Sequence, residues 1–549
     1  MTETKSYRDC LSAFTRVTAV AAALVGLQAA QAATPGITGP SFDLRAEANY
    51  ITQPDGSMVY SWGYGCQSAV DASRFRPVGI TGSCGSMQIP GPTLIVTEGD
   101  SVTVTLTNAL PAPAGNTSIL FPGFNVSTSG GAVGLVTQEA PGVGCDPVAH
   151  TGCNTVTYTF TASSPGTHTY YSGTQGDLQV EMGLYGAIVV LPKSVPAACT
   201  GGIAAQNLAA QGAHGETNFR LAASAYDHPA SCYDREYLFQ FSEMDPVIHH
   251  QAEEQVAAAQ ACAADASNTQ PCPGLNVATE PYHPAYFMVN GRSMPDDMDP
   301  NYAPQYPHQP YNGNPHMHPG ELVLLRIIGN GRWQHPFHEH GNHVRILARD
   351  GNLILSSSAN PSSPALTDLA GPLLFTTTTT PGLTMDGIFY WTGKGLNWDV
   401  FGHHAGTAGS STAVATCTPD GNGYYTSDPT AINYYEWCAD HNKSLETAPF
   451  GDVGSGGPVT LPNANILTNG AWYGGSPYLG PDATVRAVGA TGTTPPSGTI
   501  ANSPSSEAGF AFMWHSHNER EITTNNIFPG GMMMMMLVDS REFVINEAN

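Results

Sequence analysis

The sequence predicts an all-β protein made of tandem β-sandwich domains with long loop insertions. Gly and Pro contribute 60 and 43 of the 549 residues, and both interrupt long helices. Segments such as 101–106 alternate polar and apolar residues, which is the pattern of a strand with one buried face. The chain is also too long for a single hydrophobic core, so we expect more than one domain.

Charge in this chain is sparse and mostly negative. Only 11% of the residues are charged, and 19 Lys and Arg stand against 44 Asp and Glu, for a formal net charge of −25. A chain this acidic offers little material for the basic face of a nucleic-acid-binding protein, so we expect no nucleic-acid partner. Histidine occurs 19 times, as often as Lys and Arg together, and this excess of imidazoles needs a reason.

The first element is a secretory signal peptide, predicted at residues 1–32. Lys5, Arg8 and Arg16 precede an apolar run over 17–27, and residues 30–32 (Ala-Gln-Ala) fit a cleavage site. The alternative is an N-terminal membrane anchor, which the shortness of the apolar run disfavours. We therefore expect export to the periplasm, the cell surface or the extracellular space, with no transmembrane segment in the mature chain.

The cysteines point to the same oxidising environment. Cys10 falls in the signal peptide, and the ten that remain are even in number and lie in sequential close pairs. Local disulfides are the simplest interpretation, although the sequence alone leaves the connectivity open. The pairs are Cys66 with Cys84, Cys145 with Cys153, Cys199 with Cys232, Cys262 with Cys272, and Cys417 with Cys438.

Two similar segments indicate two copies of one sandwich domain. Residues 92–100 and 319–321 each place Pro, Gly and Glu at or near the start of an apolar strand. We assign domain 1 to residues 33–200, a linker of small residues to 201–216, and domain 2 to 217–549. Within domain 2 we expect one substantial helix at 251–264 and a Gly-, Ser- and Thr-rich insertion at about 400–508. A third domain in the long second half is the alternative.

Pairs of histidines carry the chemical signal. Residues i and i+2 of a strand point to the same side, so His338 projects with His340, and His515 projects with His517. On neighbouring strands these four imidazoles would meet at one point. Nitrogen ligands without a thiolate favour copper, with zinc as the alternative. We predict one copper ion held by these four side chains, and we take His335 and His343 as weaker candidate ligands.

A structural role is the alternative for each of these histidines, because a single buried histidine is more often a hydrogen-bonded core residue. This alternative is stronger for His316 and His318, which share the i, i+2 spacing. The methionine run 532–536 offers thioethers to Cu(I). However, it continues into Leu537 and Val538, which is typical of a buried strand.

The histidine motifs resemble those of multicopper oxidases. Residues 335–341 (His-Pro-Phe-His-Glu-His-Gly) are similar to the family's H-P-x-H-x-H-G signature, and residues 515–517 (His-Ser-His) are similar to its C-terminal H-C-H element. Residues 166–189 resemble the end of the family's first domain. The resemblance implies cupredoxin-like Greek-key sandwiches with copper as the cofactor. It also implies a homotrimer, as in copper nitrite reductases.

The resemblance fails at several ligand positions. Residues 117–123 and 170–173 match segments that carry histidines in the family, and here they contain none. The cysteine of the family's blue copper site falls at Ser516, and the next histidine of that site falls at Glu521, so His335 is the only strong ligand left there. Half of the histidines of the family's trinuclear cluster are missing, and we do not expect four-electron reduction of oxygen.

Three functions fit this pattern. The first is a secreted copper-binding protein with one remodelled site. The second is a copper-dependent oxidoreductase with a single copper, in which Glu339, Glu519 or Glu521 would relay protons or add a ligand. The third is a metal-free structural surface protein on a cupredoxin scaffold. The fold alone does not separate them.

Overall fold

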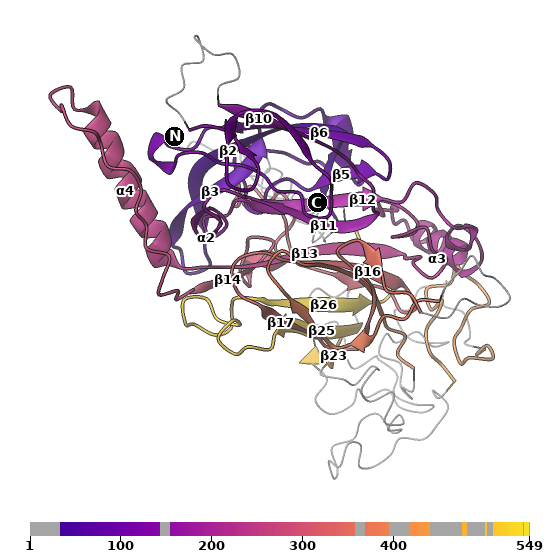
Figure 1. Cartoon of the computed structure of the whole chain (residues 1–549). Helices are drawn as coiled ribbons and strands as arrows, with labels where there is room; N and C mark the ends of the chain where they lie inside the picture. The colour runs from indigo at the N-terminus through magenta and orange to yellow at the C-terminus, as the bar shows by residue number, and fades with distance from the viewer. Residues whose placement is uncertain are drawn as a thin grey trace, which may run out of the picture.

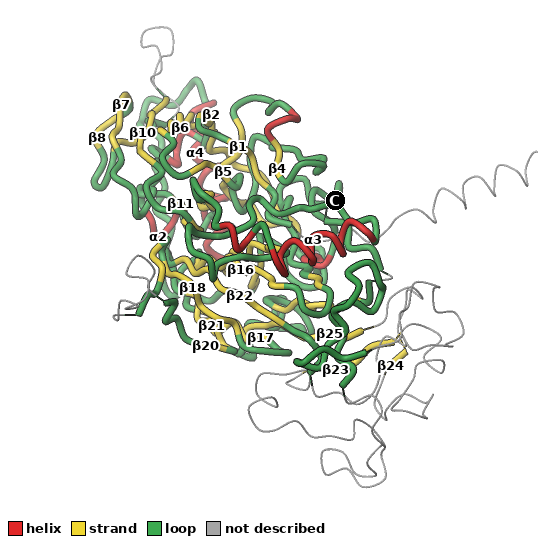
Figure 2. Tube along the Cα trace, turned by 90° about the vertical axis from the view of Figure 1, so that its right-hand side faces the viewer, coloured by secondary structure: helices red, strands yellow, loops and turns green. Residues whose placement is uncertain are grey.

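The computed structural model describes residues 33–142, 154–356, 368–394, 418–439, 475–479, 500–501, 509–541 and 543–547. These residues consist mostly of strands and loops, as Figure 2 shows, which confirms the predicted all-β fold. Four large sheets form two sandwiches. In Figure 1 the sandwich formed by the N-terminal part of the chain lies above the sandwich formed by the C-terminal part. The predicted signal peptide lies outside the described residues.

The sandwich nearer the N-terminus, domain 1, has two five-stranded sheets with the orders β11-β12-β5-β1-β4 and β3-β2-β6-β10-β7. In β6 (Ser101–Asn108), Val102, Val104 and Leu106 are buried while the threonines between them are partly exposed, as the alternation predicts. The other strands are β1 (Gly36–Thr38), β2 (Ser41–Thr52), β3 (Met58–Cys66), β4 (Phe75–Arg76), β5 (Leu94–Thr97), β7 (Ser127–Gly130), β10 (Thr155–Thr161), β11 (Gly166–Tyr171) and β12 (Tyr185–Leu191), with β8 (Ala132–Val133) and β9 (Gln138–Glu139) forming a small hairpin.

Domain 2 has two larger sheets. One follows the order β14-β13-β16-β22-β18-β19 with β20 beside β18, and the other follows β15-β26-β25-β17-β21 with β23 beside β25 and β24 beside β23. Its strands are β13 (Arg235–Met244), β14 (Tyr286–Val289), β15 (His316–Met317), β16 (Leu322–Gly329), β17 (His335–Glu339), β18 (Val344–Arg349), β19 (Asn352–Leu353), β20 (Leu373–Leu374), β21 (Thr376–Thr379), β22 (Thr384–Tyr390), β23 (Gly475–Leu479), β24 (Ile500–Ala501), β25 (Gly509–Ser516) and β26 (Met533–Asp539). The predicted insertion therefore adds strands β23 and β24 to the sheet.

Two longer helices join the sandwiches. Helix α4 (Pro246–Ala264) contains the predicted helix and begins earlier, because the Asp245 side chain accepts a hydrogen bond from the Val247 amide at 2.9 Å and Pro246 suits the first turn. It packs Ile248 and Ala252 into the core of domain 1 and projects from the side of the molecule (Figure 1). Most of the predicted linker is helix α3 (Gly202–Ala213), which we did not expect. Its alanines explain the helix. The short α2 spans Gly176–Gln179.

The methionine run forms the buried strand that its pattern predicts. Met532, Met534 and Met536 are fully buried in the hydrophobic core of domain 2, beside Phe512 and Trp514 of the neighbouring strand. Strand β26 pairs with β25 along its whole length. These thioethers therefore pack against aromatic rings, an environment in which methionine is stabilising without any metal.

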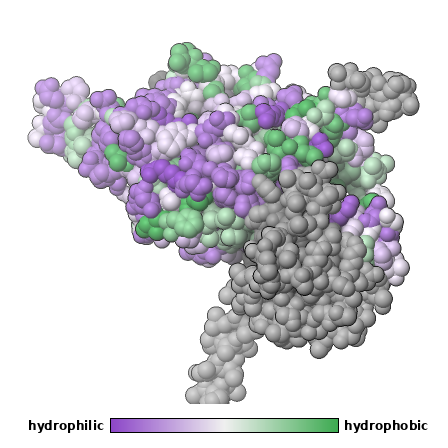
Figure 3. All heavy atoms as spheres, turned by 90° about the horizontal axis from the view of Figure 1, so that it is seen from below, coloured by the Kyte–Doolittle hydropathy of each residue, from purple (hydrophilic) through white to green (hydrophobic). Residues whose placement is uncertain are grey.

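Disulfides link a strand, a helix and several loops. Three predicted pairs are confirmed, namely Cys66–Cys84, Cys199–Cys232 and Cys262–Cys272. Cys438 is also disulfide-bonded, whereas Cys145, Cys153 and Cys417 lie outside the described residues. None of the helices in the described ranges combines the length and the apolar character of a membrane span. Seen from below, the described surface is mostly hydrophilic with smaller hydrophobic patches (Figure 3).

Candidate metal centre

Two neighbouring strands bring the histidine pairs together. Strand β17 runs antiparallel to β25, and their register places His338 directly opposite His515. Phe337 and Trp514, the residues next to them, are fully buried in the core of domain 2. Because side chains alternate along a strand, these apolar residues point to one face of the sheet and the imidazoles point to the other.

The four imidazole rings form one cluster. The ring centroid of His338 lies 4.8 Å from that of His340, 5.6 Å from that of His515 and 5.0 Å from that of His517. The centroid of His515 lies 5.1 Å from that of His340 and 5.5 Å from that of His517. His338 and His515 are buried, whereas the side chain of His517 is 55% exposed. The pairs thus meet as their spacing predicts, and one side of the cluster is open to solvent.

One pair of ring nitrogens has the spacing of two ligands on the same metal. Nε2 of His515 and Nε2 of His340 are 3.2 Å apart. Two nitrogens bound at about 2.0 Å in a tetrahedral site are about 3.3 Å apart. As the side chains stand, no three His, Cys, Asp or Glu residues in the described ranges are arranged to hold a metal. The cluster therefore supplies a suitable set of donors, and binding through all four would require their rings to turn.

The surroundings of the cluster favour neutral imidazoles. Burial, together with the charges that His340, His515 and His517 would carry, lowers the pKa of His338 to about 4. Burial also lowers the pKa of His515. Thr376 of β21 is hydrogen-bonded to Nδ1 of His338 at 2.8 Å. Because a metal binds the neutral form of histidine, these two rings need not lose a proton before binding one at neutral pH.

A different network surrounds His335, which the resemblance places in the blue copper site. Its Nδ1 lies 2.9 Å from Glu521, and its Nε2 lies 2.9 Å from Glu243. The hydroxyl of Ser516 donates to the same oxygen of Glu521 at 2.5 Å. Burial opposes a charged His335, but the hydrogen bonds to Glu243 and Glu521 outweigh it and raise the pKa of His335 to about 9. Both ring nitrogens of this imidazolium therefore bind carboxylates, and His335 stays apart from the cluster.

In domain 1, neutral polar groups occupy the segments that carry histidines in the family. The hydroxyls of Thr117 and Ser172 both donate to Oε1 of Gln179, at 2.8 and 2.7 Å. Leu120 and Tyr171 pair across the two segments. Hydroxyl and amide oxygens suit copper poorly compared with imidazole. These segments therefore close on each other through hydrogen bonds.

The other predicted site residues lie in three different places. The ring centroid of His343 is 4.8 Å from that of Phe375, beside the cluster. Glu339 is fully buried on the opposite face of β17, where Thr377 donates to it at 2.5 Å and burial raises its pKa to about 8. Glu519 is exposed, with Oε1 3.7 Å from Nδ1 of His517. Of the three predicted carboxylates, Glu519 is the one next to the cluster.

Two residues that contact these histidines were not predicted from the sequence. Thr376 contacts His338, and Glu243 contacts His335 from the buried strand β13. Each lies far from its partner in the sequence and belongs to no motif. Glu243 lies in a strand that is buried along its whole length. A buried carboxylate needs a hydrogen-bonding or charged partner, so this position is the one feature of the sequence that could have predicted a partner for Glu243.

Residues 84–195, which make up most of domain 1, match the family model described as multicopper oxidase. Over this segment the chain is similar to a multicopper oxidase domain. This match confirms the resemblance to the multicopper oxidase family, and it rests on a part of the chain outside both histidine motifs. No curated protein sequence matches the chain.

Solved multicopper oxidase structures are similar over most of the chain at low identity. The multicopper oxidase mgLAC covers 91% of this chain and 86% of its own, with 15% identity and a TM-score of 0.40. A blue copper oxidase from Nitrosomonas europaea covers 91% and 85%, with 15% identity and a TM-score of 0.41. A copper nitrite reductase from the same organism covers 65% and 86%, with 18% identity and a TM-score of 0.36. The functional argument therefore rests on the residues of this chain.

Proposed function

We propose that this protein is an exported copper-binding member of the multicopper oxidase family, which holds one copper through His338, His340, His515 and His517. The observation that supports it is the cluster of these four imidazole rings on two paired strands. Copper in such a site can exchange one electron between Cu(I) and Cu(II). The chain's own contribution is a set of imidazole nitrogen donors, half of them buried, at the ends of two paired strands.

The same residues argue against the family's other copper sites. Ser516 offers a hydroxyl in place of a thiolate, and that hydroxyl is already bonded to Glu521. His335 is held between two carboxylates. A blue site depends on a copper–thiolate bond, so we propose that this position is metal-free. With no histidines in the matching segments of domain 1, the proposed protein also lacks a trinuclear cluster.

Export is part of the proposal. Three disulfides within the described residues favour an oxidising compartment, because the cytosol keeps such thiols reduced. Residues 1–32 have the pattern of a signal peptide. Both features suit a periplasmic or extracellular protein that meets copper outside the cytoplasm.

Copper loading tests the proposal. We expect protein loaded with Cu(II) and then desalted to retain about one copper per chain. The double variant His338→Ala/His515→Ala should retain none, because half of the ligand set is gone. A matched double variant at exposed positions, His250→Ala/His283→Ala, should bind as the wild type does. If the cluster variant keeps its copper, or zinc binds in preference at equal concentration, the proposal is wrong.

A single substitution at an exposed ligand tests the site even if the double variant misfolds. The side chain of His517 is 55% exposed, so His517→Ala should fold normally. We expect it to bind copper at least about ten-fold more weakly, by loss of one of four ligands. Unchanged affinity in folded His517→Ala would remove this residue from the site.

A second candidate is a copper-dependent oxidoreductase. The exposure of His517 leaves one side of the cluster open to a small molecule, and Glu519 lies 3.7 Å from its ring. In this role Glu519 would accept a proton from the substrate. Oxygen uptake with Cu(I), Mn(II) or phenols as electron donors would support it. Glu519→Gln should then slow turnover without changing copper content.

A further inference from the structure

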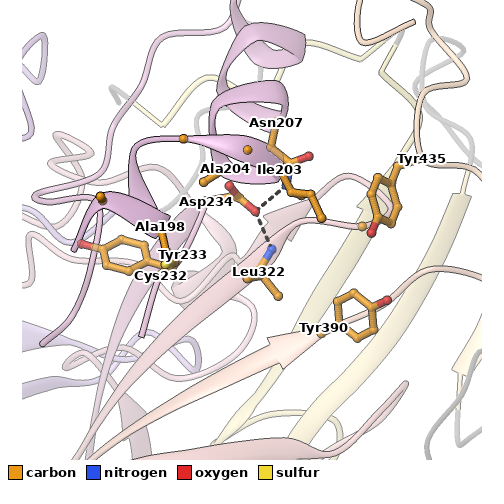
Figure 4. Close-up of a pocket in the computed structure, with 14 residues that line it drawn as sticks. Ala198, Ile203, Ala204, Asn207, Cys232, Tyr233, Asp234, Leu322, Tyr390 and Tyr435 are labelled. Atoms are coloured by element: carbon orange, nitrogen blue, oxygen red, sulfur yellow. Dashed lines mark hydrogen bonds between the residues drawn. The ribbon is translucent and has the colours of Figure 1, made fainter. Parts of the chain in front are cut away.

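A large cavity lies between the linker helix and domain 2, built from residues outside the histidine cluster. It has a volume of about 740 Å³ and is lined by α3, the residues before β13 and β16, and the end of β22 (Figure 4). Its walls are mostly apolar, including Ala198, Ile203 and Leu322, and Tyr390 and Tyr435 add aromatic rings. Its size and lining are those of a site for a small organic molecule.

The polar groups of this cavity gather at Asp234. Oδ2 of Asp234 accepts hydrogen bonds from Nδ2 of Asn207 at 2.8 Å and from the Leu322 amide at 2.9 Å, drawn as dashed lines in Figure 4. This arrangement fixes the amide of Asn207, since a flipped amide would bring two oxygens together. Oδ1 of Asn207 then points away from Asp234 and has no hydrogen-bond partner, although the side chain is only 2% exposed.

The buried charge of Asp234 is only partly compensated, by Arg220, which lowers the pKa of Asp234 less than burial raises it. The residue is 5% exposed, and among the described residues no Lys, Arg or His forms an ion pair with it. Burial, with a contribution from Glu321, raises the pKa of Asp234 to about 6, so the carboxylate is mostly charged at neutral pH. A buried carboxylate without an ion pair is costly, and an unpaired amide acceptor beside it adds to the cost. Both costs fall if a ligand brings a positively charged donor.

The walls of the cavity are held in place covalently. The Cys199–Cys232 disulfide ties the segment before α3 to the residue preceding Tyr233. The hydroxyl of Tyr233 donates to Glu236 at 2.9 Å, which anchors this residue in the core beside the cavity. Ile203, on the α3 side, leaves 59% of its side chain exposed, although it is a large apolar residue. A preformed wall of this kind lowers the entropic cost of binding.

We propose that this cavity binds a small organic amine, with its ammonium group at Asp234 and Asn207 and its apolar body against α3 and Leu322. The tyrosine rings favour the same class of ligand, because aromatic faces attract organic cations. The site is independent of the histidine cluster and of any metal. Neutral alcohols and carboxylates of the same shape lack the charge that Asp234 requires.

Calorimetric titration with 2-phenylethylamine tests this proposal, with 2-phenylethanol and 3-phenylpropanoate as matched probes. We expect saturable binding of the amine and at least about ten-fold weaker binding of the other two, from loss of a charged hydrogen bond. Asp234→Asn should weaken amine binding by about ten-fold for the same reason. Ala204→Trp, which places a large ring in the cavity, should abolish binding, and Ala209→Trp, exposed on the same helix outside the cavity, should not.

Three outcomes would overturn the proposal. The amine and the alcohol could bind equally well, which would remove the role of Asp234. Ala204→Trp could bind as the wild type does, which would place the ligand elsewhere. The wild type could also show no saturable binding of the amine. Because Ala204→Trp removes no hydrogen-bonding group, it decides the matter even if Asp234→Asn fails to fold.

Discussion

At the scale of single residues, one hydrogen-bonded chain occupies the position that we propose to be metal-free. It runs from Ser516 through Glu521 and His335 to Glu243. A serine hydroxyl donates well to a carboxylate, and an imidazolium is stable between two carboxylates. These residues satisfy one another without a metal, which supports the proposal that this position binds none.

Removing one carboxylate from this chain should destabilise the fold. Glu243→Gln takes the negative charge from one side of His335 and weakens the acceptor for the Arg332 and Trp333 amides, which donate to Glu243 at 2.6 and 2.8 Å. We expect the free energy of unfolding to fall by about 3 kcal/mol, as for other broken buried ion pairs. Denaturant titration measures this change. Glu519→Gln, at an exposed site, is the control and should change stability by less than about 0.5 kcal/mol.

Stability should also fall as the pH rises. The pKa of His335 is raised to about 9 in the folded protein, against about 6.5 when unfolded. Its stabilising contribution is therefore complete below about pH 6.5 and is lost as the pH passes through about 9. Between about pH 6.5 and about pH 9 the free energy of unfolding should therefore fall less in His335→Gln than in the wild type, by on the order of 3 kcal/mol. Equal pH profiles for the two proteins would show that His335 is not charged in the fold.

Sequence spacing alone cannot identify a ligand. His316 and His318 have the same i, i+2 spacing as the cluster, yet Nδ1 of His316 lies 2.6 Å from Asp539 and Nε2 of His318 lies 2.7 Å from Glu216. The partners of these rings come from distant parts of the chain. The spacing predicts which side chains share a face, and only the packed structure shows whether carboxylates or other imidazoles meet them there.

At the scale of elements, the paired strands β17, β25 and β26 determine both core and site. Alternation along β25 buries Phe512 and Trp514 and turns His515 to the other face. Such alternation is visible in the sequence, which is why the fold class and the histidine pairs could be predicted. Helix α3 was missed because its small residues are equally typical of a linker, and its docking on domain 2 depends on distant contacts such as Asn207 with Asp234.

Substitutions in strand β26 test whether its methionines serve as core residues or as copper ligands. Met534 is fully buried, so Met534→Ala should lower the free energy of unfolding by about 3 kcal/mol through the cavity it leaves. Met535 is only partly buried and should cost less on truncation. Neither Met534→Leu nor Met535→Leu should change the copper content. A loss of copper in a stable Leu variant would make the run a ligand.

At the scale of the whole molecule, the two sandwiches meet through buried polar contacts. Asp386 of β22 accepts hydrogen bonds from the amide and hydroxyl of Thr167 in β11, at 3.0 and 2.5 Å, and from the hydroxyl of Tyr226 at 2.5 Å. These bonds tie domain 2 to domain 1. A shared network of this kind should make the domains unfold together.

Removal of this acceptor should uncouple the domains. Asp386→Ala leaves three buried donors without a partner, at about 1 to 3 kcal/mol each if they remain unpaired. We expect the single thermal transition of the wild type to divide into two in a calorimetric scan. Asp368→Ala, at an exposed site, should keep one transition. A single transition in Asp386→Ala would mean that other contacts carry the coupling.

The central claim is that one copper is held by imidazoles and that no blue site exists. Absorption and electron paramagnetic resonance spectra of the Cu(II)-loaded protein test it most directly. We predict a single Cu(II) signal with splitting from imidazole nitrogens, no intense blue absorption band, and loss of that signal in His338→Ala/His515→Ala. An intense blue band, or a copper signal that survives in the double variant, would contradict the account.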